Sequence, residues 1–171
     1  MSEQKDGRAL VVRPIASAAE REACARLMSD SEPWRTLGRD YETSLALLSD
    51  PTREAYWIEH AGAWAGFLLL YLHGPFRGYI QTICLDPACR GRGVGTMALG
   101  WAEERIFRES PNVFLCVSDF NRGALRLYQR LGYELVGALP DFLVSGSAEL
   151  LLRKTRGPWV AFRHSPSDPT G

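Results

Sequence analysis

Two strand–helix–strand units in the middle of the chain constrain the fold more than any other feature. The first joins strands at residues 78–85 and 113–117 through a helix that runs to about residue 109. The apolar residues of this helix recur at helical spacing, at Val94, Met97, Ala98 and Trp101. A helical crossover returns the second strand parallel to the first, so the central sheet has to be partly parallel.

The second unit follows directly. Ala124, Leu127, Tyr128 and Leu131 repeat at helical spacing, and Gly132 stands where the helix needs a left-handed C-cap. The remaining elements are predicted from the periodicity of apolar residues and from the Pro, Gly and Asp residues that end each element. They are a strand at 10–15, helices at 19–29 and 39–50, strands at 55–59 and 64–72, and strands at 133–143 and 148–153. This order predicts an α/β (α+β) domain with a mixed sheet of about seven strands and about four helices.

Length and charge set the class of protein. The 171 residues fit one domain, which we assign to residues 1–155, followed by a C-terminal tail at 156–171. Lys plus Arg number 20 and Asp plus Glu number 20, so the formal net charge is zero. No long run of one sign appears, and we therefore expect neither nucleic-acid nor anionic membrane binding.

Targeting and metal signals are weak. The longest central apolar stretch, residues 63–72, is about half of the ~20 residues that a membrane span needs, and residues 1–8 are polar. We therefore expect a cytoplasmic protein. The four cysteines form no Cys-x-x-Cys pair and have no His at ligand spacing, so the sequence predicts no metal site and no disulfide framework.

The most informative motif is a glycine cluster between a strand and a helix. It reads Arg90, Gly91, Arg92, Gly93, Val94, Gly95 and Thr96. Glycines let a ligand approach the backbone, and the free N–H groups at a helix start attract an anion such as a pyrophosphate. Neither a dinucleotide-binding glycine fingerprint nor a Gly-Lys-Ser/Thr phosphate loop is present. The alternative is a tight turn whose arginines face solvent.

The cluster resembles the acyl-CoA loop of the GNAT superfamily of N-acetyltransferases, which reads Arg/Gln-x-x-Gly-x-Gly/Ala. The preceding Leu85-Asp86-Pro87 is similar to the strand end that leads into this loop in the family. Residues 121–133 are similar to its second conserved segment, Asn-x-x-Ala-x-x-Leu-Tyr-x-x-x-Gly-Phe/Tyr. The predicted element order agrees with the GNAT fold over residues 10–153.

The resemblance implies roles for particular residues. The backbone of Ile83, Cys84 and Leu85 is expected to pair with the pantetheine arm of acetyl-CoA, in a sheet that splays in its middle to hold the acyl-CoA. The amides of the Arg90–Thr96 loop would hold the pyrophosphate, and Asn121 would hydrogen-bond the pantetheine. Tyr128 would protonate the departing thiolate, although a buried structural tyrosine is the alternative.

The activity implied is acetyl transfer from acetyl-CoA to a primary amine by direct attack in a ternary complex. We expect a small-molecule acceptor. The alternatives are a protein or peptide N-terminal acetyltransferase and a non-catalytic acyl-CoA-binding module. The loop that contains Trp34 is expected to form part of the acceptor wall, or else to pack into the core. The two terminal strands and the aromatic tail are candidates for a homodimer contact, because exposed sheet edges often pair with a partner.

The general base stays open at this point. Glu59, Asp119 and Glu149 are acids on strands or at strand ends, and each could equally be a solvated surface residue. A chain of water molecules could take the proton instead. Cys84 and Cys116 invite an acyl-cysteine mechanism, but no base is suggested beside them and we interpret both as small buried apolar residues.

Overall fold

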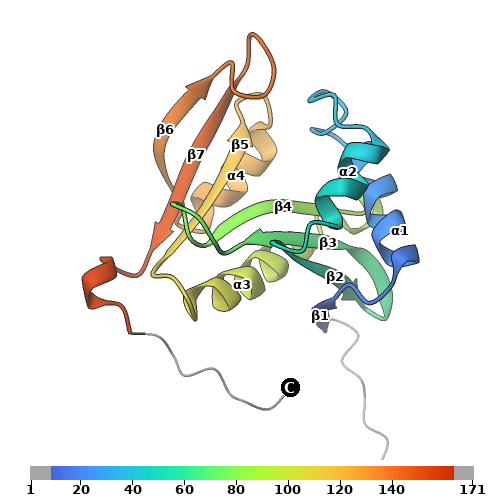
Figure 1. Ribbon diagram of the computed structural model, residues 1–171, viewed down its shortest axis with the longest axis horizontal. Coiled ribbons are helices and arrows are strands. Elements are labelled where there is room, and N and C mark those ends of the chain that lie inside the picture. The colour runs from blue at the N-terminus through green and yellow to red at the C-terminus, as the bar shows by residue number, and fades with distance from the viewer. Residues whose placement is uncertain (1–8, 164–171) are drawn as a thin grey trace, which may run out of the picture. The chain divides into compact units, whose positions relative to one another are not determined.

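The structure is a computed structural model that describes residues 9–163 (Figure 1), so residues 1–8 and residues 164–171 of the predicted tail lie outside the described residues. The described chain forms two compact units that interleave along the sequence. One contains the residues up to Leu69 together with Thr82–Trp101, and the other contains Leu70–Gln81 together with the residues from Ala102 onward.

Seven strands and four α-helices form within residues 9–163, as the sequence predicted. The hydrogen-bonded strand order is β1-β2-β3-β4-β5-β7-β6. β4 pairs with β5 in parallel, whereas β1 with β2, β5 with β7 and β6 with β7 are antiparallel. The predicted mixed sheet is thus confirmed, and its parallel pair is the one that the central crossover helix required.

The first unit contains most of the N-terminal elements. They are β1 (Leu10–Pro14), α1 (Ala18–Ser29), α2 (Tyr41–Leu48), β2 (Glu54–His60) and β3 (Ala63–Tyr71, whose last two residues belong to the other unit). Figure 1 shows α1 in blue and α2 in cyan next to one another. Each helix begins at a side-chain cap, Ser17 for α1 and Asp40 for α2. Cys24, Met28 and Phe67 are among the fully buried residues of their core.

The second unit contains β5 (Asn112–Ser118), α4 (Arg122–Arg130), β6 (Glu134–Pro140) and β7 (Ala148–Thr155). In Figure 1, β5, β7 and β6 are the adjacent strands in yellow to orange-red. β4 (Tyr79–Leu85) and α3 (Val94–Phe107) each have one end in this unit and the other end in the first.

Two ends of elements show how local chemistry sets the boundaries. α4 ends in a Schellman motif, in which Gly132 has φ 88° and the Tyr133 N–H donates to the Tyr128 carbonyl at 3.0 Å, as predicted for this glycine. The strand predicted at 133–143 is shorter, because Asp141 takes φ 52° and its carboxylate accepts the Gly146 N–H at 2.7 Å. This turn ends β6 at Pro140.

The described part of the predicted tail packs against the second unit. The Arg77 guanidinium lies 5.7 Å from the ring centre of Trp159, and the Trp159 and Phe162 rings meet edge to face. None of the helices within the described residues is long and apolar enough to cross a membrane.

Candidate functional site

The end of β4 is held tightly by β3 in the first unit. A Cβ atom on Gly66 of β3 would lie 2.1 Å from the Cys84 carbonyl oxygen and 2.8 Å from the Leu85 Cα, so only glycine fits there. Just beyond, the Asp86 N–H donates to the Ala65 carbonyl at 2.9 Å. The backbone of residues 83–85, the segment that the resemblance assigns to pantetheine, is therefore fixed on its β3 side.

The pairing between β4 and β5 is short. Its register pairs, Tyr79 with Phe114 and Ile80 with Leu115, use only the first two residues of β4. Ile83, Cys84 and Leu85 lie beyond these pairs along the strand. Cys84 is buried, whereas Ile83 and Leu85 are half-buried.

The glycine cluster forms an open loop at the start of α3. A short 3-10 helix, Pro87–Cys89, begins where the Asp86 carboxylate accepts the Ala88 N–H at 2.8 Å. Gly91 and Gly93 then take φ 72° and 80°, and no protein atom lies within 4 Å of a Cβ built on either. Glycine is therefore required at these two positions by the backbone conformation and not by packing.

The helix start offers unpaired backbone donors. The Met97 N–H donates to the Gly93 carbonyl at 3.1 Å, which leaves the N–H groups of Val94, Gly95 and Thr96 ahead of the first intrahelical bond. Arg90 and Arg92 are exposed beside this turn, and Arg90 Nη2 donates to the Leu85 carbonyl at 3.4 Å. Free N–H groups and two guanidinium groups together suit the oxygens of a phosphate or pyrophosphate.

Asn121 has a structural role that the motif did not reveal. It is the N-cap of α4, and its Oδ1 accepts the Ala124 N–H at 3.3 Å. The side-chain oxygen is thus engaged, while the amide Nδ2 has no partner among the residues described and can donate to a ligand. A hydrogen bond to pantetheine would use this nitrogen.

Tyr128 lies on α4 and is buried. Its ring meets that of Tyr133 edge to face with centres 5.9 Å apart, and burial raises the pKa of its phenol to about 12. Its hydroxyl has no hydrogen-bond partner among residues 9–163. The Tyr128 phenol is therefore neutral at every pH at which such a protein works. Its O–H group donates to no other described residue, so it can donate a hydrogen bond to a ligand.

The cysteines are poorly suited to covalent catalysis. Cys84 is almost fully buried, and burial raises the pKa of its thiol to about 12, as it also does for Cys24. Burial likewise raises the pKa of Cys116. Because the thiolate is the nucleophile, these shifts disfavour an acyl-cysteine intermediate.

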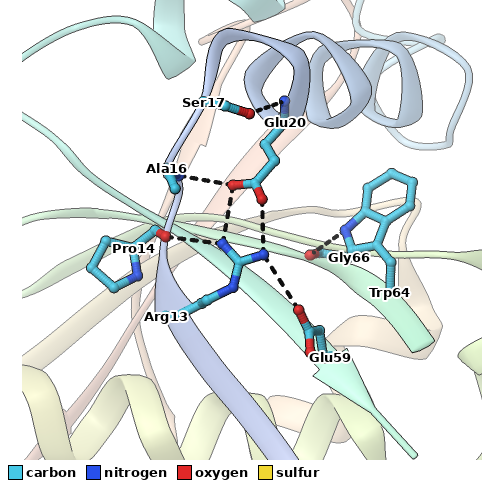
Figure 2. Close-up of polar contacts among 8 residues, drawn as sticks. All are labelled: Arg13, Pro14, Ala16, Ser17, Glu20, Glu59, Trp64 and Gly66. Carbon is cyan, nitrogen blue, oxygen red and sulfur yellow. Dashed lines mark hydrogen bonds and ion pairs between the residues drawn. The ribbon is translucent and has the colours of Figure 1, made fainter. Parts of the chain in front are cut away.

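Glu59 is held in an ion-pair network of the first unit (Figure 2). The Arg13 guanidinium binds Glu20 through both of its terminal nitrogens and reaches Glu59 at 3.3 Å. The same guanidinium lies 5.5 Å from the centre of the Trp57 ring. The hydrogen bond from Arg13 holds the pKa of Glu20 below its ordinary value. Glu59 thus joins β2 to β1 and α1, which is a structural role.

The two acids of the second unit differ from each other. Asp119 accepts from Ser147 Oγ at 3.0 Å and from the Ala148 N–H at 3.2 Å, so it fastens the loop before β7. Glu149 is buried on β7, and its Oε1 accepts from Ser118 Oγ at 2.5 Å. Burial raises the pKa of Glu149, and the bond from Ser118 opposes that shift. No sequence signal separated these two acids.

Trp34 packs against the core of the first unit, together with Leu27 and Tyr41. The loop around it is braced by the Glu32 carboxylate, which accepts from the backbone and the hydroxyl of Thr36. Core packing is thus the role that the structure shows for this tryptophan.

Comparison with known proteins gives the same family as the motifs. A model of the acetyltransferase (GNAT) family matches residues 18–133. The N-alpha-acetyltransferase RimI of Mycobacterium tuberculosis is 29% identical over 137 residues, 78% of this chain and 82% of that protein. A solved aminoglycoside 6'-N-acetyltransferase complexed with coenzyme A shares the fold, with a TM-score of 0.69 and 15% identity over 86% of this chain and 98% of that one.

Other relatives are longer than this chain. An uncharacterised protein of Mycobacterium leprae is 30% identical over 84% of this chain, which spans 40% of its length. A mycothiol acetyltransferase of Mycobacterium sp. (strain JLS) is 34% identical over 44% of this chain, and the match spans 27% of its length.

Proposed function

The chain belongs to the GNAT family of acetyltransferases. We propose that it transfers the acetyl group of acetyl-CoA to the primary amine of a small molecule, by direct attack in a ternary complex. The observation that carries the proposal is the open loop at Gly91 and Gly93, which continues into a helix with free first-turn N–H groups. In this proposal the loop binds the pyrophosphate of acetyl-CoA, and Ile83–Leu85 and Asn121 bind its pantetheine arm.

Each step of the transfer has a candidate group. The amine nitrogen attacks the thioester carbonyl, the C–S bond breaks, and the electron pair leaves on sulfur. Tyr128 donates a hydrogen bond to that sulfur, since its phenol stays neutral. The raised pKa values of Cys84 and Cys116 support this route over one through an acyl-cysteine.

The loop assignment predicts a specific loss of acetyl-CoA affinity in Gly93→Ala. A Cβ at Gly93 would point into open space where the ligand has to approach, so we expect the Kd for acetyl-CoA, measured by titration calorimetry, to rise at least about tenfold. Gly62→Ala is the matched control, because Gly62 has φ 78° and also has nothing within 4 Å. Both variants carry the same backbone strain of about 1–2 kcal/mol. An unchanged Kd in Gly93→Ala would remove the loop from the binding site.

The two candidate functions, a small-molecule and a protein N-terminal acetyltransferase, differ in the acceptor amine. The relative named for mycothiol supports a small molecule, whereas RimI, which matches over more of both chains, supports a protein N-terminus as the second candidate. We would incubate the full chain and acetyl-CoA with spermidine, kanamycin, cysteamine or a hexapeptide with a free N-terminus, and measure CoA by chromatography. Release with the small amines alone supports the first candidate, and release with the peptide alone supports the second. Acetyl-CoA binding without release from any amine would indicate a binding module.

A homodimer stays a prediction. Its most suitable surface is the outer strand β6, on which Leu135 and Val136 are more than half exposed.

A further inference from the structure

The two faces of the sheet in the second unit are covered differently. Val113, Leu115 and Val117 alternate along β5 and are almost fully buried. Lys154 of β7 pairs with Val113 in register, and its ammonium binds the Glu103 carboxylate of α3 at 2.6 Å. Since paired residues share a face, α3 lies on this face.

The opposite face carries a row of polar groups. Phe114, Cys116 and Ser118 alternate with the residues above and therefore point the other way. Ser118 pairs in register with Glu149, and Tyr79 pairs with Phe114. Tyr79, Cys116, Ser118 and Glu149 thus share this face, and the Tyr79 hydroxyl interacts with the Cys116 thiol. On β6, the residue opposite Glu149 is the apolar Leu139.

Glu149 is an unusual residue for such a position. Its exposed fraction is 5%, and that of Ser118 is 2%. Within residues 9–163 no Lys, Arg or His forms an ion pair with Glu149, and Ser118 is the only side chain that donates to it. A buried carboxylate without a cation costs stability that Gln or an apolar residue would not. A structural role therefore explains Glu149 poorly, whereas a role in proton transfer explains it well.

We propose that Glu149 is the general base of this acetyltransferase: its free carboxylate oxygen, Oε2, accepts the proton that the acceptor amine loses when its nitrogen attacks the thioester carbonyl. The N–C bond forms and the C–S bond breaks. The proton from nitrogen goes to Glu149 and then to water, and the sulfur leaves as a thiolate, which takes its proton from water. This inference rests on the proposed acetyl transfer.

The surroundings of Glu149 suit this role. Burial and the Asp119 carboxylate both raise its pKa, while Ser118 lowers it. A base whose pKa is closer to neutral takes a proton more readily than an ordinary carboxylate does. Tyr79 and Cys116 on this face have pKa values raised by burial, so they stay neutral at pH 7. Arg153, which pairs with Phe114, and Glu134, which pairs with Arg153, lie on the same face, and both are exposed, unlike Glu149.

Three variants test the assignment in the full chain, with whichever of the four amines above reacts fastest. Glu149→Gln keeps the shape and the contact with Ser118, and we expect kcat to fall about 10²–10⁴-fold with little change in the Kd for acetyl-CoA. In the wild type, kcat/KM should fall at acidic pH as Glu149 becomes protonated. This acidic limb of the pH profile should disappear in Glu149→Gln. Ser118→Ala removes the bond that lowers the Glu149 pKa and should move this limb to higher pH. Asp119→Asn removes a nearby negative charge and should move it to lower pH.

The controls separate this inference from the proposed function. Glu134→Gln removes an exposed carboxylate of the same unit, and we expect its rate and pH profile to match those of the wild type. Thermal unfolding of each variant shows whether it is folded. A folded Glu149→Gln variant with the wild-type kcat and the same limb, or with a raised KM alone, overturns the base assignment and leaves acetyl transfer standing. If Glu149→Gln does not fold, the other two variants decide. An acidic limb that stays at the wild-type pH in both Ser118→Ala and Asp119→Asn also overturns the base assignment. Wild-type protein that acetylates no amine overturns both.

Discussion

Gly66→Ala is expected to destabilise the first unit by at least about 3 kcal/mol, because its new methyl group would overlap backbone atoms. The Cβ would lie 2.1 Å from the Cys84 carbonyl oxygen, and Gly66 itself has φ 141°, which L-residues rarely adopt. No side chain can move aside to relieve this overlap. At about 2–4 °C per kcal/mol for a chain of this size, Tm should fall by on the order of 10 °C, as measured by circular dichroism.

Gly62→Ala again supplies the control. It adds a methyl group at φ 78° with no atom within 4 Å, so only the backbone strain of about 1–2 kcal/mol applies. A Tm for Gly66→Ala equal to that for Gly62→Ala would show that β3 can move away from β4. If Gly66→Ala loses acetyl-CoA binding at temperatures where it is still folded, the close approach of β3 to β4 is needed for acetyl-CoA binding as well as for stability.

The contrast between Gly66 and Gly93 shows which features the sequence could predict. Gly93 lies in a local motif between a strand and a helix, and its turn and helix start formed as predicted. Gly66 lies within a predicted strand, and nothing nearby in the sequence indicates its contact with Cys84, about twenty residues away. Contacts of this kind depend on which strands become neighbours.

The same reason explains why the candidate base was not found from the sequence. Glu59, Asp119 and Glu149 are alike as strand-end acids, and only the pairing of strands shows that Arg13 engages Glu59 and that Ser118 faces Glu149. Boundaries set by local chemistry were predicted more closely. The C-cap at Gly132 was correct, whereas the Asp141 turn, which depends on a side chain reaching Gly146, was missed.

Tyr128→Phe should lower kcat about 100-fold while leaving the Kd for acetyl-CoA nearly unchanged. Phe keeps the buried ring and its edge-to-face contact with Tyr133, and only the hydroxyl is lost. A positioned acid contributes about 10²–10⁴-fold, and we expect the lower end. The reason is that the Tyr128 pKa of about 12 lies well above that of a thiol, about 8.5, so the phenol stabilises the leaving sulfur by donation more than by complete transfer. Single-turnover kinetics would measure the effect on the chemical step.

Tyr133→Phe is the matched control for Tyr128→Phe, since it removes a second buried hydroxyl from the same aromatic pair. The Tyr133 hydroxyl has no hydrogen-bond partner in the described part of the chain, and the nearby Glu103 carboxylate is bound by Lys154. We therefore expect Tyr133→Phe to keep the wild-type kcat. The pH dependence gives a further check: a phenol with a pKa of about 12 stays protonated below about pH 11, so Tyr128→Phe should lower the rate equally across the neutral range without moving either limb. A single-turnover rate that Tyr128→Phe leaves intact would assign this tyrosine to packing, and a large rise in the acetyl-CoA Kd would assign its hydroxyl to cofactor binding.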